Sequence, residues 1–182
     1  MKTTFISMLL LLLFAGSNLS AQNSKYSDSR YSERYGNTLN LGLGIGGYSG
    51  YYGYIGHTVP VLSINYEFGV ANNFTLAPFA TFYTYHYNYY RETVIPIGGK
   101  ATYYFDQILG AGQDWDFYLA GSLGFAIVNT RWDSGYYQDN NYHAVNPLFL
   151  DLHIGAEYHL SQKVGLFLDL STGVSTIGLA FH

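Results

Sequence analysis

The chain has 182 residues and a net charge of −4, and its composition departs from that of a water-soluble domain. Charged residues make up 11% of it, against roughly 25% in soluble domains, whereas aromatic residues make up 19%. No cluster of lysine and arginine is present, which argues against nucleic acid as a partner. The absence of cysteine excludes disulfides and cysteine lipidation.

The first residues are typical of a secretory signal. Lys2 supplies a positive charge, Phe5–Phe14 forms a short apolar run, and small residues lead up to Ala21. That run is shorter than the ~20 residues of a membrane-spanning helix. We therefore expect a signal peptide at residues 1–21, with cleavage between Ala21 and Gln22. The polar residues 22–37 show no apolar periodicity, and we expect them to form a flexible periplasmic linker.

From residue 38 to residue 182 the sequence alternates, with a period of two, between bulky apolar residues and small or polar ones. This alternation predicts β-strands. For residues 75–85, which are aromatic and β-branched, the pattern does not separate the two faces. The eight expected strands are 39–46, 62–68, 75–85, 94–105, 116–128, 148–159, 164–170 and 175–182.

The two faces of these strands have a consistent chemistry, with leucine, isoleucine, phenylalanine and tyrosine on one face. Glycine, serine, threonine, asparagine and a few charges occupy the other. A soluble barrel reverses this order, whereas a barrel in lipid turns its bulky apolar face outward. We therefore predict an all-β fold, an eight-stranded antiparallel up-and-down transmembrane β-barrel spanning residues 38–182 in a bacterial outer membrane.

The connections are expected to differ between the two ends of the barrel. Gly69–Asn73 and Leu160–Lys163 read as tight turns, whereas Ser49–Thr58, His86–Thr93 and Asn129–Pro147 read as longer, tyrosine-rich loops. Short periplasmic turns and longer outer loops are typical of outer-membrane barrels. Two connections depart from this pattern. Asp106–Asp114 is long for a periplasmic turn, and Ser171–Val174 is short for an outer loop.

Six titratable residues fall on the predicted inner face. An interior enclosed by eight strands is filled by side chains, so charges there need partners. We expect a structural polar network in a closed lumen, the alternative being a proton-gated or ion-conducting path. The six residues are Glu67, Lys100, Asp151, His153, Glu157 and Asp169.

Metal binding and catalysis have weaker support in the sequence. His153, Glu157 and His159 share a strand face, but the two histidines lie ~20 Å apart along it and cannot join one tetrahedral site. The alternative is a metal held by one of these residues with partners elsewhere in the chain. A lipid-modifying enzyme would need a serine, a histidine and a carboxylate together near the outer rim. Residues of these types occur in the expected outer loops without a distinguishing motif, so we assign no catalytic residue, cofactor or metal. They are His86, His143, Ser49, Ser134, Asp133 and Asp139.

The aromatic residues divide into two groups. Those at strand ends suit an interfacial girdle: Tyr66, Phe68, Tyr103, Phe105, Trp115 and Tyr158. The second group lies in the expected outer loops: Tyr51, Tyr52, Tyr54, Tyr87, Tyr89, Tyr90, Tyr136, Tyr137 and Tyr142. These tyrosines either form a surface for extracellular contacts or belong to strands that continue beyond the membrane.

Four segments resemble the small OmpA- and OmpX-like outer-membrane barrels of Gram-negative bacteria. They are the export junction Ser20-Ala21-Gln22, the strand Ile95-Pro96-Ile97-Gly98 with Lys100 and Tyr103-Tyr104-Phe105, the strand Val164–Asp169, and the closing Ile177–His182. The resemblance covers about residues 38–182. It implies an eight-stranded barrel placed by the outer-membrane insertion machinery, and it implies no common reaction.

These observations lead to one hypothesis and two alternatives. We expect a monomeric, non-enzymatic barrel with an envelope-structural or surface-interaction role. Its partners would be outer-membrane lipid and lipopolysaccharide, the insertion machinery and extracellular contacts through tyrosine-rich loops. The alternatives are a lipid-modifying outer-membrane enzyme and a soluble, lipocalin-like ligand-binding barrel, whose interior would be apolar.

Overall fold

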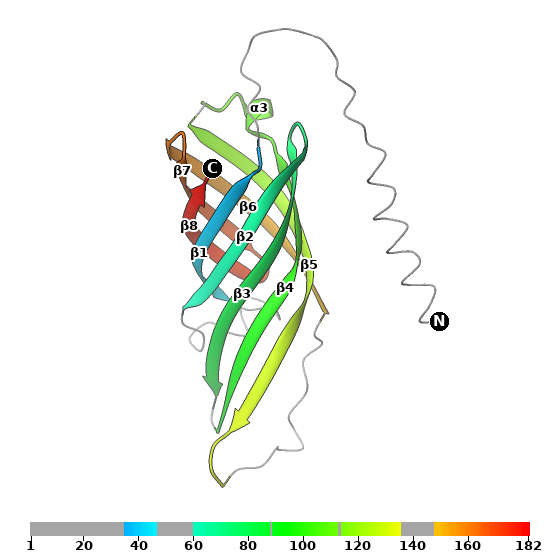
Figure 1. Ribbon diagram of the computed structural model, residues 1–182, viewed down its shortest axis with the longest axis vertical. Coiled ribbons are helices and arrows are strands. Elements are labelled where there is room, and N and C mark those ends of the chain that lie inside the picture. Colours follow the sequence, from blue (N-terminus) through cyan, green and yellow to red (C-terminus); the bar gives the residue numbers. More distant parts are fainter. Residues whose placement is uncertain (1–34, 47–59, 88, 113, 136–147) are drawn as a thin grey trace, which may run out of the picture. The chain divides into compact units, whose positions relative to one another are not determined.

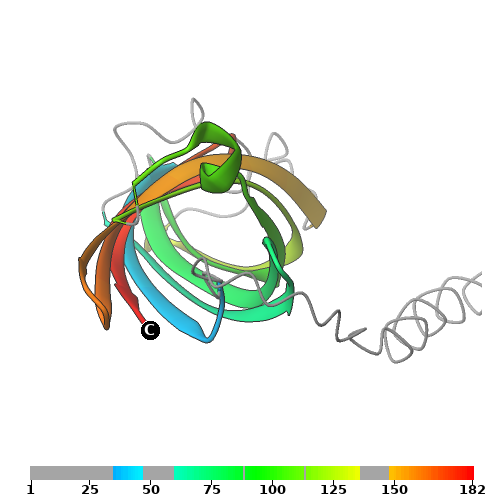
Figure 2. The ribbon, with the colours of Figure 1, turned by 90° about the horizontal axis from the view of Figure 1, so that it is seen from above.

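The computed structural model describes residues 35–46, 60–87, 89–112, 114–135 and 148–182, which form a closed barrel of eight antiparallel strands (Figure 1). Each strand pairs with the next along the chain, and β1 pairs with β8 to complete the ring in Figure 2. The predicted fold is confirmed. The strands are β1 (Thr38–Gly46), β2 (Val61–Ala71), β3 (Phe74–Tyr87), β4 (Tyr90–Tyr104), β5 (Trp115–Trp132), β6 (Leu148–Ser161), β7 (Val164–Ser171) and β8 (Val174–Phe181).

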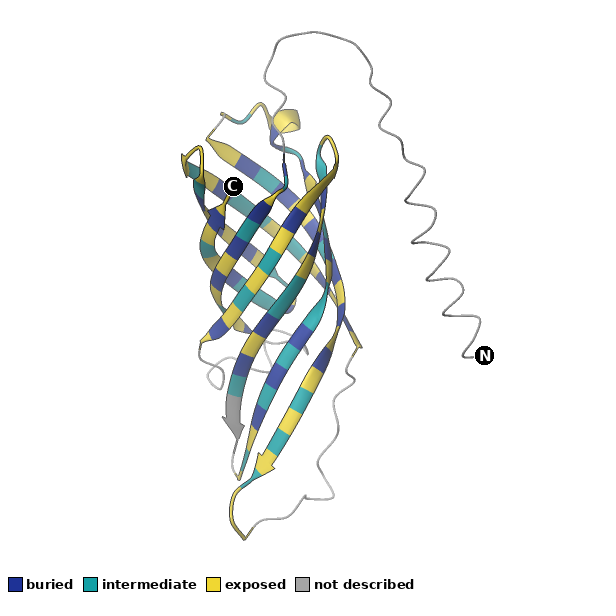
Figure 3. Cartoon of the chain, viewed as in Figure 1, coloured by how far each residue is buried: buried dark blue, intermediate teal, exposed yellow. Residues whose placement is uncertain are grey.

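Burial alternates along most of each strand, as the banding in Figure 3 shows. On β6, Leu150 and Leu152 are 70% and 64% exposed, whereas Asp151 between them is 8% exposed. The exterior is therefore apolar, and the polar residue points into the barrel, which is the reverse of a soluble barrel. On β3 the facing is now settled, since Thr75 and Tyr83 lie inside the barrel wall, fully buried.

The two ends of the barrel differ in their connections. We call the end where β1 begins and β8 ends the terminal mouth, and the opposite end the far end. At the terminal mouth, β2–β3 and β6–β7 are joined by two-residue turns, while β4–β5 contains the short helix α3 (Asp106–Leu109). In the described part of the chain, no helix is long and apolar enough to span a membrane.

One loop prediction at the far end is wrong. The expected loop His86–Thr93 is mostly strand, because β3 continues to Tyr87 and β4 begins at Tyr90. The ladder pairs Tyr87 with Tyr90 and His86 with Arg91, so the two strands run on as a paired ribbon. Similarly, β5 extends to Trp132 into the expected loop 129–147, of which residues 136–147 lie outside the described residues.

The interior has two zones. Toward the far end, five buried apolar residues pack together, Val61, Tyr83, Val94, Ala126 and Phe149, and the buried Glu92 lies beyond them on β4. The rest of the lumen is lined largely by polar and charged side chains around a cavity of about 60 Å³. Such a volume holds only a few water molecules. The lumen is therefore largely filled, by an apolar cluster in its far part and by mostly polar side chains in the rest, and the sequence did not predict the apolar cluster.

The terminal mouth is partly covered by the residues that precede β1. Tyr35 is buried and stacks on Tyr104, with ring centroids 4.2 Å apart, and its hydroxyl donates to Asp106 Oδ2 at 2.7 Å. Gly36 has a positive φ of 96°, and a Cβ there would collide with the backbone of Gly69. Residues 35–37 thus belong to the barrel. The expected signal peptide, its cleavage site and residues 22–34 of the expected linker lie outside the described residues.

Candidate functional site

The six titratable residues that the sequence places on the inner face all line the central cavity. The reason is the two-residue period of their strands, which turns every second side chain inward. All are well shielded from solvent. Glu67, Lys100, Asp151, Glu157 and Asp169 are 3–8% exposed, and the side chain of His153 is 12% exposed.

Asp169 on β7 is the acceptor for side chains from three other strands. Lys100 on β4 contacts its Oδ2 at 2.5 Å, and the Tyr118 hydroxyl on β5 donates to the same atom at 3.1 Å. His153 on β6 donates through Nδ1 to Oδ1 at 2.7 Å. The Lys100 ammonium also lies 4.9 Å from the centre of the Tyr118 ring. One carboxylate therefore joins β4, β5, β6 and β7.

Glu67 on β2 has the same role on the other side of the barrel. Asn40 on β1 donates to its Oε1 at 2.9 Å. Thr75 on β3 and Tyr104 on β4 donate to its Oε2 at 2.6 and 2.7 Å. The second carboxylate thus joins β1, β2, β3 and β4, so the two groups meet at β4.

Asp151 lies apart from both groups, toward the far end. Its Oδ1 accepts a hydrogen bond from the Thr172 hydroxyl at 3.2 Å, in the turn between β7 and β8. The neighbouring Gly173 leaves the space that the Asp151 carboxylate occupies, since a Cβ there would collide with it. The expected lumen residues therefore form separate groups along the barrel.

One arrangement inside the lumen resembles a nucleophilic triad. The Ser122 hydroxyl lies 2.9 Å from His153 Nε2, and His153 Nδ1 contacts Asp169. This is the order of nucleophile, base and orienting carboxylate. However, Ser122 is 4% exposed, and the space beside it is the small central cavity. In addition, the Asp169 carboxylate that contacts His153 is also in contact with the Lys100 ammonium.

The loop residues considered for lipid chemistry are largely beyond what the structure describes. Ser49, Asp139 and His143 lie outside the described residues, as does the side chain of His86. Asp133 and Ser134 are exposed at the far end, just after β5. Nothing in the described residues brings these loop candidates together.

A further group of polar residues lies at the terminal mouth. Glu157 is buried on β6, and its Oε1 accepts from His182 Nε2 at 2.7 Å. The other nitrogen of His182 lies 3.1 Å from the Thr38 hydroxyl on β1. His159 contacts Asp116 Oδ2 at 2.9 Å through Nε2. These bonds join β1, β5, β6 and the end of β8.

Sequence reasoning did not single out His182, Asp116 or Ser122. His182 continues the inner face of β8, after Thr176 and Ala180. This two-residue spacing is the feature of the sequence that could have identified it as a lumen residue. What the sequence does not contain is the neighbour: His182 meets Glu157 across β7 because β6 and the end of β8 both lie beside β7 in this register. Likewise, Asp116 meets His159 only through the register of β5 on β6.

The aromatic residues expected at the membrane interface lie at the terminal mouth. Those that face outward are 37–45% exposed, namely Tyr66, Phe68, Tyr103, Trp115 and Tyr158. Of the tyrosines expected in outer loops, Tyr51, Tyr52, Tyr54, Tyr136, Tyr137 and Tyr142 lie outside the described residues, as does the side chain of Tyr87. Tyr90 packs on Trp132 with ring centroids 5.1 Å apart, so it belongs to the strand extension.

No family model and no curated protein matches the chain. Solved structures that it resembles include Neisserial surface protein A, with a TM-score of 0.49 and 16% identity over 79% of this chain and 94% of that one. The Yersinia pestis outer membrane protein Ail has a TM-score of 0.43 and 11% identity over 81% and 99%. The outer membrane enzyme PagL has a TM-score of 0.36 and 13% identity over 79% and 97%.

The barrel itself defines where the chain resides. Its strands form a closed ring, so every strand has a paired neighbour on each side, and large apolar side chains cover its exterior. In lipid, backbone polar groups must be satisfied internally, and a closed barrel is the β-structure that meets this condition. An eight-stranded antiparallel barrel with this exterior is an outer-membrane β-barrel.

Proposed function

We propose that the protein is a non-enzymatic outer-membrane barrel with a closed lumen, acting as a structural component of the envelope or as a scaffold for surface contacts. The supporting observation is the way in which Glu67 and Asp169 occupy the lumen. Each carboxylate accepts hydrogen bonds from three other strands, and together they join β1 to β7. Side chains used in this way stabilise the wall of the barrel and fill much of the lumen around a cavity of about 60 Å³.

The energetics favour a structural role for these groups. A buried carboxylate is costly to desolvate, and bonds to a charged group recover about 1.5–3 kcal/mol each. Asp169 receives three such contacts and Glu67 receives three. A catalytic residue must instead be accessible to its substrate, and a residue that lines an ion path must be accessible to water. The partners of the protein in this proposal are outer-membrane lipid, lipopolysaccharide and the insertion machinery.

The experiment combines location with conductance. Cells are fractionated, the barrel is identified by heat-modifiable migration on gels, and the purified protein is reconstituted in planar lipid bilayers. We expect recovery with the outer membrane and no stepwise ion conductance. Recovery in the soluble periplasm, or reproducible channel openings that Lys100→Met alters, would overturn the proposal.

The lipid-modifying alternative has one observation in its favour, the order Ser122–His153–Asp169. If these residues were catalytic, Ser122→Ala would abolish a change in lipid A or phospholipid acyl chains that the wild-type gene restores in a deletion strain. We expect no lipid difference between wild type, the deletion strain and Ser122→Ala. A serine-dependent difference would replace the structural proposal by the enzymatic one.

A further inference from the structure

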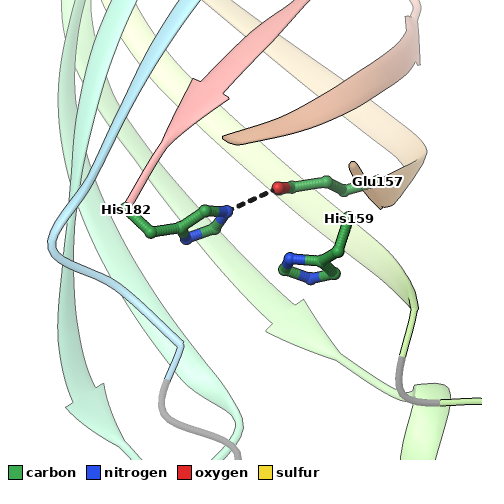
Figure 4. Close-up of side chains that lie close together, drawn as sticks. All are labelled: Glu157, His159 and His182. Carbon is green, nitrogen blue, oxygen red and sulfur yellow. Dashed lines mark hydrogen bonds and ion pairs between the residues drawn. The ribbon is translucent and has the colours of Figure 1, made fainter. Parts of the chain in front are cut away.

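Three side chains of metal-binding type come together at the terminal mouth, outside the groups around Glu67 and Asp169. Glu157 and His159 lie two residues apart on β6, and His182 follows β8. Each offers one donor atom, and these atoms all lie within 4.8 Å of one another. Figure 4 shows the Glu157 carboxylate turned toward His182, with the His159 ring beside them.

These distances are close to those of a metal site. Zinc bonds to nitrogen and oxygen measure roughly 2.0–2.2 Å, so tetrahedral donors lie about 3.3 Å apart. The pair His182 Nε2 and Glu157 Oε1 is already 2.7 Å apart, and the two imidazole rings lie 5.0 Å apart between centroids. A movement of one ring by ~1.5 Å would therefore bring the donors into range.

Each histidine is also held by a second residue, as metal-ligating histidines usually are. Asp116 contacts Nε2 of His159, and Thr38 contacts Nδ1 of His182. This leaves Nε2 of His182 for the ligand role, the atom that already faces Glu157. A carboxylate behind an imidazole fixes the orientation of the ring and raises its basicity.

The two carboxylates at the terminal mouth favour the binding of a cation. Glu157 and Asp116 are direct cross-strand partners on β6 and β5, and both are buried. Asp116 Oδ1 is buried and accepts no hydrogen bond from the described residues. Like charges directly opposite each other in a ladder are destabilising. Among the described residues, Lys100 is the only buried lysine or arginine, and it contacts Asp169.

The mouth gives a cation access. The side chains of His159 and His182 are 23% and 24% exposed, although Glu157 and Asp116 behind them are only 7% and 6% exposed. A metal could therefore enter from the aqueous side and be held against buried carboxylates. Gly165 on β7 provides the space for the Glu157 side chain, since a Cβ there would collide with its carboxylate.

We infer that Glu157, His159 and His182 form a binding site for a divalent transition metal of the zinc class, with Asp116 and Thr38 as supporting residues. Two imidazoles and one carboxylate suit zinc, copper or nickel, whereas magnesium and calcium prefer all-oxygen sites. The bound ion joins β6 to the end of β8 and neutralises the carboxylate pair. It therefore stabilises the terminal mouth.

The test uses tag-free, full-length mature protein folded in detergent micelles, from which metal has been removed with a chelator. Zn²⁺ is titrated by calorimetry, with Mg²⁺ and Ca²⁺ as comparison ions, and Co²⁺ is added to follow its visible absorption. We expect one zinc ion per chain, little binding of Mg²⁺ or Ca²⁺, and a Co²⁺ spectrum of tetrahedral type with nitrogen and oxygen ligands. Zinc should also raise the temperature at which the gel migration changes.

Four variants locate the site. His159→Ala and His182→Ala should each weaken zinc binding by at least the roughly 10- to 100-fold expected for Asp116→Asn, which removes a supporting group only. The matched control is Asp114→Asn, because Asp114 is an exposed carboxylate beside the mouth that is not one of the donors. It should change zinc affinity less than about threefold if general negative charge is not the cause.

Folding of each variant is checked by heat-modifiable migration before titration, and Asp116→Asn provides a milder change if an alanine variant does not fold. Zinc binding no tighter than magnesium binding in the wild type would overturn the inference. So would unchanged zinc affinity in folded His182→Ala or Asp116→Asn. An equal loss in Asp114→Asn would reduce the site to general electrostatic attraction and would also overturn it.

Discussion

Replacing Lys100 with methionine tests whether the Asp169 group stabilises the barrel. Methionine keeps the length of the side chain but removes the ammonium that contacts Asp169 at 2.5 Å, leaving a carboxylate whose side chain is 5% exposed. Removing one partner of a buried ion pair costs about 3–5 kcal/mol. Because Asp169 keeps its contacts with His153 and Tyr118, we expect the free energy of unfolding to fall by about 3 kcal/mol, at the low end of this range.

The assay is reversible urea unfolding in lipid vesicles, followed by tryptophan fluorescence and by gel migration. A double variant, Lys100→Met with Asp169→Leu, removes both charges and should recover most of the loss, because replacing a buried pair by apolar residues is often neutral. A loss below about 1 kcal/mol for the single variant would refute the reasoning. So would a double variant no more stable than the single one.

Three further variants test other parts of the structure. Gly155→Ala places a Cβ against the Tyr118 ring and should cost about 1–3 kcal/mol in urea unfolding, and less in a Tyr118→Ala background. Tyr35→Phe keeps the stacking on Tyr104 but loses the bond to Asp106, so the same assay should show a loss of about 1.5–3 kcal/mol; an unchanged value would mean that Tyr35 does not hold the mouth. Leu123→Arg, on an outer position that is 56% exposed, should cost about 2–4 kcal/mol in vesicles if it faces lipid, with Leu123→Ala as the control, whereas a water-facing position would tolerate arginine.

The alternation of residue types predicted most of the barrel. Leu150 and Asp151 are neighbours of opposite character, and the structure places them on opposite sides of the wall. This works because a membrane barrel has two different surroundings, lipid and lumen. Around His86 and Arg91, where β3 and β4 extend as a paired ribbon, the sequence pattern predicted a loop instead of strands. There the chain carries polar and aromatic residues without a clear period of two.

The contents of the lumen were predicted as residues but not as contacts. The facing of Glu67 and Asp169 follows from period two within one strand. Their partners depend on the stagger between strands, which the sequence does not state. His182 meets Glu157 across β7, and 25 residues separate them along the chain. The apolar cluster with Tyr83 and Phe149 was also missed, because a few apolar residues on a mostly polar face do not stand out.

The seam between β1 and β8 sets an order for assembly. It pairs Leu39 on β1 with Phe181 on β8, and these two strands are the most distant along the chain. Every other pair of neighbouring strands is joined by one connection. The entropy lost on closing a loop grows with its length, so hairpins such as β7–β8 should form before the seam. Until then both edge strands expose unpaired backbone groups, which can pair with another chain. The period before seam closure is therefore when this barrel is most exposed to misassembly.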